Sequence, residues 1–153
     1  MGRINLGRVI LGGLVAGIVI DLFEGIMNGL VLAPQWAGVL TGLGRGGTMS
    51  VKQIAAFNVW GFVAGIAIVW VYAAMRPRFG SGPKTAMGAG LTVWALACML
   101  GIATPVFLHL FPIALAVTAL AVELVEMLVA GLVGAAIYKE DLAATGKSTA
   151  ARA

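Results

Sequence analysis

The chain has 153 residues, of which 61% are hydrophobic and 10% are charged, and it carries a formal net charge of +4. A soluble domain averages about 45–50% apolar and about 25% charged residues, so this composition excludes a water-soluble globular protein. The length allows one compact domain in a lipid bilayer. Because the basic residues flank the apolar runs, the positive charge indicates membrane topology, and we expect no nucleic-acid partner.

Four long apolar runs predict an all-α fold, a polytopic membrane protein with four transmembrane helices in a compact bundle. The expected spans are about 9–32, 51–75, 83–104 and 113–138. Each is long enough at about 1.5 Å per residue to cross a hydrocarbon core of about 30 Å. Residues 1–140 would form this transmembrane domain, and residues 141–153 a flexible polar tail.

The first span, which Pro34 is expected to end, carries a polar face. Gly17, Asp21, Glu24 and Asn28 follow a spacing of 4, 3 and 4 residues. Residues three and four apart are neighbours on a helix surface, so these four share one side. We expect this side to point into the bundle.

Two Gly-x-x-x-Gly pairs in the first span, Gly13 with Gly17 and Gly25 with Gly29, permit another helix to approach closely. They suit packing within the bundle or a homo-oligomer, and the sequence does not separate these uses. Cys98 in the third span is expected to be a small buried packing residue.

The segment 35–50 is a Gly-rich connection in which Trp36 and the apolar residues after it have helical spacing. We expect a short helix at the membrane interface, with the tryptophan as its anchor. Ser50 and Gln53 have the spacing of a capping box and predict the start of the second span. That span offers one polar side chain, Asn58, beside small residues.

Residues 76–85 form an expected tight basic turn, and residues 105–112 a short apolar turn with His109, the only histidine. The first turn ends like a phosphate-binding loop, but Arg78 and Pro83 stand where that pattern requires glycine. We therefore expect a membrane anchor there and no nucleotide site. Eight basic residues fall on the side of the termini and two on the other, which predicts cytoplasmic termini.

The fourth span repeats the pattern of the first. When residues 122–133 are aligned with residues 20–31, Glu123 matches Asp21 and Glu126 matches Glu24. All four acids fall near the middle of their spans, where no Lys, Arg or His occurs, and we expect the two acidic faces to be neighbours. Acidic side chains in an apolar solvent are costly and mark a functional site by default.

Several ionised carboxylates cannot coexist unpaired at low dielectric, so either most are protonated or an external cation neutralises them. The first interpretation is a small cation- or proton-handling protein, transport- or channel-like. Its candidate cation or proton site consists of Asp21, Glu24, Glu123 and Glu126. Asn28 and Asn58 would extend the polar path outward.

Two other interpretations remain open. In one, the protein is a structural or accessory membrane subunit whose protonated acids form interhelical hydrogen bonds, which average about 0.6 kcal/mol each. In the other, the acids hold a metal for redox or catalytic chemistry, for which Mg²⁺, Mn²⁺ or Ca²⁺ would suit the oxygen ligands. The di-iron layout usually adds histidine, which is missing here, so an enzyme is the less favoured expectation. We assign no catalytic residue and no organic cofactor.

Two stretches, residues 5–13 and residues 70–86 (Trp-Val-Tyr-Ala-Ala-Met-Arg-Pro-Arg-Phe-Gly-Ser-Gly-Pro-Lys-Thr-Ala), resemble a group of small bacterial membrane proteins described mostly as hypothetical. The resemblance extends over most of the chain up to Lys139. It implies a four-helix, multi-pass protein of the bacterial inner membrane. It implies no activity, substrate or site residue.

Overall fold

The computed structural model describes residues 4–139 of the chain, so the tail predicted for residues 141–153 lies outside the described part. Four of its helical segments are long and apolar enough to cross a membrane, and they confirm the predicted all-α, polytopic membrane fold. In chain order the elements are α1 (Leu6–Ile26), a π-helical turn η1 (Met27–Val31), α2 (Ala33–Gly42), α3 (Val51–Phe79), α4 (Pro83–Val93), a second π-helical segment η2 (Trp94–Met99), α5 (Leu100–Phe107) and α6 (Ile113–Ile137).

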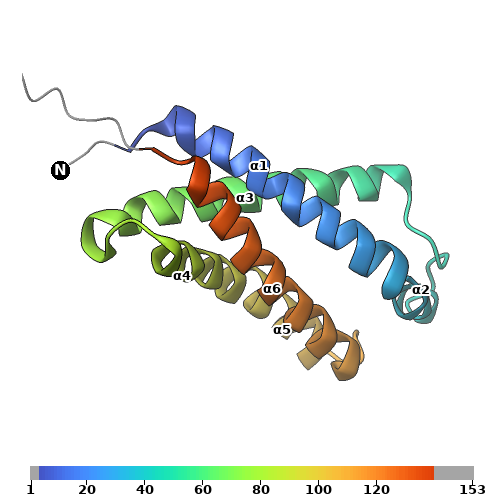
Figure 1. Cartoon of the computed structure of the whole chain (residues 1–153). Coiled ribbons are helices and arrows are strands. Elements are labelled where there is room, and N and C mark those ends of the chain that lie inside the picture. The colour runs from blue at the N-terminus through green and yellow to red at the C-terminus, as the bar shows by residue number, and fades with distance from the viewer. Residues whose placement is uncertain (1–3, 140–153) are drawn as a thin grey trace, which may run out of the picture.

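The bundle is arranged around α3 and α6. Both α1 and α4 pack on these two helices, and α3 and α6 also contact each other. Figure 1 shows α1 and α6 crossing, with α3 behind them. Ile20 of α1, Ile68 of α3 and Met127 of α6 are fully buried at the centre. The remaining surface is rich in exposed apolar side chains, as expected where the solvent is lipid.

Glycine lets α1 and α3 approach closely. A Cβ atom added to Gly65 of α3 would run into the backbone of Gly13 and Gly17 on α1, so neither helix has room for a side chain there. The first predicted Gly-x-x-x-Gly pair is therefore used within the bundle. The second pair, Gly25 and Gly29, has open space around it.

The start of α1 and the end of α6 lie together (Figure 1). The backbone N–H of Asn5 donates to the hydroxyl of Tyr138 at 3.4 Å. The Arg76 guanidinium lies over the rings of Tyr72 and Tyr138, at 5.7 and 5.3 Å from their centroids. These contacts join both ends of the chain's membrane domain to the end of α3.

The helix boundaries differ from the approximate expected spans by a few residues. α1 begins at Leu6 instead of residue 9, because the Asn5 side chain accepts the backbone N–H of Arg8 at 2.9 Å and caps the helix. The fourth span ends at Ile137 instead of residue 138. The predicted start of α3 is confirmed, with a capping box formed at Ser50.

The predicted turns 76–85 and 105–112 are shorter in the structure. α3 continues through Pro77 to Phe79, and α5 continues through Pro105 to Phe107. A proline removes one backbone hydrogen bond and strains the helix, yet near a helix end it need not stop it. α3 stops instead at Gly80, whose φ of 81° lies outside the helical region.

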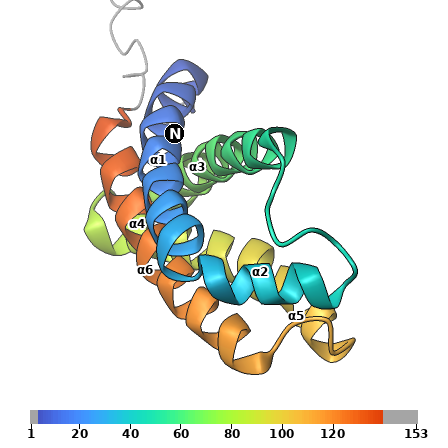
Figure 2. The same ribbon diagram turned by 90° about the vertical axis from the view of Figure 1, so that its right-hand side faces the viewer.

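Pro34 was predicted to end the first span, and this is wrong. The chain turns at Leu32, and Pro34 lies in the first turn of α2, a position that suits its fixed φ. α2 confirms the expected short helix around Trp36. Figure 2 shows α2 turned away from the axis of α1, at the end of the molecule opposite the start of α1 and the end of α6.

Candidate functional site

α1 and α6 bring the two acidic pairs together. They pack against each other with Gly12 close to Gly134, where an added Cβ at Gly12 would stand 2.7 Å from the carbonyl oxygen of Gly134. The prediction that the first and fourth spans are neighbours is confirmed. The acids follow Gly12 in α1 and precede Gly134 in α6, so both pairs lie toward the α2 end of the molecule.

Each of the four carboxyl groups lies within electrostatic range of at least two of the others. Glu126 interacts with Glu24, Glu123 and Asp21, and Glu123 also interacts with Glu24. We call Asp21, Glu24, Glu123 and Glu126 the carboxylate layer. That these four residues form a cation or proton site stays a prediction.

Glu126 is the most enclosed member of the carboxylate layer. It is 0% exposed, and within residues 4–139 neither of its carboxyl oxygens has a hydrogen-bond partner. Oε2 of Glu123 is likewise buried without a partner in this part of the chain. A buried polar group left unsatisfied costs about 1–3 kcal/mol and calls for an explanation, such as a strained, catalytic or ion-binding role.

Glu24 is the member with a hydrogen-bonded support. The Asn28 amide nitrogen donates to Oε2 of Glu24 at 2.7 Å, and the Asn28 carbonyl oxygen accepts from the indole Nε1 of Trp36 at 2.8 Å. This chain of bonds runs from the carboxylate layer to α2. The sequence predicted Trp36 only as an interfacial anchor, because the turn that folds α2 back toward Asn28 leaves no pattern in the sequence.

Asp21 and the predicted polar path have different surroundings. Asp21 lies where α1 packs on α3, and a Cβ atom at Gly61 would run into its carboxylate. Asn58, one turn earlier on α3, is exposed and donates to the carbonyl oxygen of Ile54 at 2.8 Å. The structure therefore joins Asn28 to the acids and leaves Asn58 bonded to its own helix.

Both π-helical segments border the carboxylate layer. η1 begins three residues after Glu24, and η2 contains Cys98, whose thiol interacts with Glu123. Trp94, the first residue of η2, donates from its indole Nε1 to the carbonyl oxygen of Leu120 on α6 at 3.0 Å. Such wide turns are rare and occur frequently at functional sites. Cys98 is buried as predicted, but beside a carboxyl group and not only among packing residues.

The acids do not form a ready-made metal cage. In the described part of the chain, no three or more His, Cys, Asp and Glu side chains are placed so that they hold a metal ion. A metal ion bound here would have to draw the carboxyl groups closer together.

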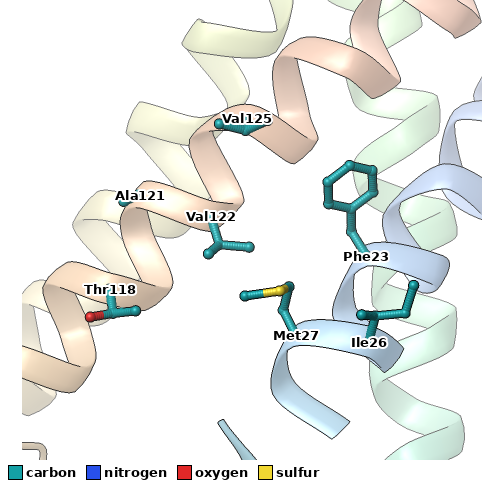
Figure 3. Close-up of a pocket in the computed structure, with 7 residues that line it drawn as sticks. All are labelled: Phe23, Ile26, Met27, Thr118, Ala121, Val122 and Val125. Carbon is teal, nitrogen blue, oxygen red and sulfur yellow. The ribbon is translucent and has the colours of Figure 1, made fainter. Parts of the chain in front are cut away.

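An apolar groove of about 440 Å³ lies between α1 and α6 where the two helices diverge (Figure 3). Its lining consists of Phe23, Ile26, Met27, Thr118, Ala121, Val122 and Val125. The one hydroxyl among them donates to the carbonyl oxygen of Ala114 at 2.9 Å. No acid is among these lining residues.

In comparisons with protein-family models, with curated proteins and with solved structures, nothing matches this chain. The resemblance to small bacterial membrane proteins therefore stays a prediction. The function has to be argued from the carboxylate layer itself.

Proposed function

We propose that this protein handles protons or small cations inside the membrane, in a transport- or channel-like manner, through the carboxylate layer. The observation that carries the proposal is Glu126, which is fully buried and makes no hydrogen bond within the described residues. A bound proton or cation would neutralise this carboxyl group, for which the described residues supply no hydrogen-bond partner. Intramembrane acids with this surrounding are characteristic of proton and ion pathways.

The arrangement argues against acids that serve only as interhelical hydrogen bonds. Such a role requires bonds from one helix to another, and neither oxygen of Glu126 forms one with any described residue. The hydrogen bond of Glu24 is made to Asn28, on the helical segment that continues α1. Between helices only the contact of Glu123 with the Cys98 thiol remains, and Glu126, the fully buried acid, has no interhelical bond to offset its burial.

The path we propose follows the spacing of the acids. A proton or cation held at Glu126 lies within electrostatic range of Glu24 and Glu123, so it is passed among groups of the same kind. From Glu24 the path continues to Asn28, toward the α2 end of the molecule. No Lys, Arg or His in the interior of the four spans could form an ion pair with these acids in place of a proton or cation.

The proposal includes a bacterial inner-membrane location with both termini in the cytoplasm. It is supported by the distribution of basic residues, since cytoplasmic loops carry the excess of Lys and Arg. The basic residues on the side of the termini are Arg3, Arg8, Arg76, Arg78, Lys84, Lys139, Lys147 and Arg152, and those on the other side are Arg45 and Lys52.

Infrared difference spectroscopy of the protein in lipid bilayers tests the proposal. We expect the carboxyl bands of the wild type to change between about pH 5 and about pH 9, or on addition of Na⁺, K⁺, Mg²⁺ or Ca²⁺. The variant Glu126→Gln should lack part of this change, and the exposed-site variant Asn58→Ala should keep all of it. A response to pH alone identifies protons, and a response to one ion at constant pH identifies that ion. Bands that stay constant under every condition would contradict the proposal.

A further inference from the structure

Asn28 occupies a fixed orientation between two groups of opposite hydrogen-bonding character. The indole Nε1 of Trp36 is only a donor, so its partner is the Asn28 carbonyl oxygen, and the Asn28 N–H₂ group is left for Glu24, which is only an acceptor when it is ionised. The Asn28 amide must therefore turn its oxygen to Trp36 and its nitrogen to Glu24, as the distances of 2.8 and 2.7 Å show. Turning the amide over would set its N–H₂ group against the indole N–H.

Trp36 thus determines which end of the Asn28 amide faces Glu24. Because Trp36 holds the Asn28 oxygen, Asn28 presents a donor to Glu24 and nothing else. A hydrogen bond to an ionised carboxylate is roughly twice as strong as one between neutral groups. Any change of charge at Glu24 therefore changes the strength of the whole chain of bonds.

Trp36 also attaches α2 to the turn before α6. Its ring packs edge-on against Phe111, in the turn before α6, with centroids 5.3 Å apart. Farther along the same helix, Gly38 and Gly42 have open space around them. Between α1 and α2 the chain passes through η1, a wide turn at Asn28 itself. Trp36 therefore connects α2 both to Asn28 on η1 and to Phe111 before α6.

We propose that Trp36 is a positioning residue of the carboxylate layer, which orients Glu24 through Asn28 and couples α2 to the charge on Glu24. The acids that face Glu24 are Asp21 on its own helix and Glu123 and Glu126 on α6. The hydrogen-bonded coupling stands by itself. Its use, in which an arriving proton or cation loosens α2, rests on the proposed function.

The test uses the indole N–H signals of the full chain in lipid nanodiscs, read in ¹H–¹⁵N correlation spectra. The chain has four tryptophans, and Trp36→Phe identifies the Trp36 signal while its ring still faces Phe111. In Asn28→Ala we expect this signal to shift and its hydrogen exchange to become about threefold to tenfold faster. Glu24→Gln should shift it as well, and this second shift should vanish when Asn28 is already Ala.

The exposed Trp70 supplies the internal control, since its signal should not move in any of these variants. An Asn28→Ala variant with an unshifted Trp36 signal would overturn the proposal. So would a Trp36 signal that shifts in Asn28→Ala but not in Glu24→Gln, because α2 would then be bound to Asn28 without being coupled to Glu24.

A second measurement separates this proposal from the proposed function. Trp36→Phe should change the infrared carboxyl response to ions or pH, and the matched variant Trp70→Phe should leave it as in the wild type. A normal response in Trp36→Phe counts against the positioning role. A wild type without any carboxyl response contradicts the proposed function, while the coupling seen in the indole signals would still hold.

Discussion

Replacing Glu126 with methionine should stabilise the protein while removing the group that we place at the centre of its function. Glu126 is 0% exposed, and neither carboxyl oxygen has a hydrogen-bond partner in the described chain. The unsatisfied group costs about 1–3 kcal/mol, and methionine fills a similar unbranched volume without that cost. We therefore expect the free energy of unfolding to rise by about 1–3 kcal/mol. Buried charged groups replaced by well-packed apolar ones often give gains of this size.

The assay is unfolding in mixed micelles with increasing SDS, followed by the helical circular dichroism signal. Glu24→Met is the matched control, since it also removes an acid of the carboxylate layer but breaks the bond from Asn28. Interhelical and local polar bonds in membranes average about 0.6 kcal/mol, so Glu24→Met should gain less than Glu126→Met. A loss of about 1 kcal/mol or more in Glu126→Met would show the opposite, that Glu126 holds the helices together.

Two further predictions concern packing and topology. Gly65→Ala should lower the free energy of unfolding by about 1–3 kcal/mol in the same SDS assay, because its methyl group meets the backbone of α1. Gly101→Ala, with open space around it, should be neutral or slightly stabilising, and equal effects at both positions would contradict the packing. In a Cys98→Ala background, Thr41→Cys and Ser81→Cys should react with an impermeant thiol reagent from opposite sides of the membrane. Labelling of both from one side would contradict a chain that crosses four times.

The helices and the carboxylate layer could be predicted from the sequence because their signals are local and large. Four apolar runs of membrane-spanning length leave few folds, and a spacing of three residues puts Glu123 and Glu126 on neighbouring positions of one helix. The cost of acids in lipid then requires both acidic faces to turn inward, and α1 and α6 do pack against each other.

The rest of the candidate site depends on backbone geometry that has no local pattern. Asn28 lies in the π-helical turn η1, after which the chain changes direction into α2. The bond from Trp36 to Asn28 therefore joins residues eight positions apart. The second π-helical segment brings Cys98 beside Glu123, which the sequence presented only as a small apolar position. Likewise, prolines suggested helix ends at positions where the helices continue.

Flux through the carboxylate layer is the central claim, and reconstituted vesicles measure it directly. The wild type and Glu126→Gln are inserted at equal density into liposomes that hold a pH-sensitive dye and a set gradient of protons, Na⁺, K⁺, Mg²⁺ or Ca²⁺. We expect the wild type to dissipate at least one of these gradients faster than protein-free vesicles, and Glu126→Gln to fall to the protein-free rate. Equal rates in the wild type and Glu126→Gln, for every gradient, would contradict this claim.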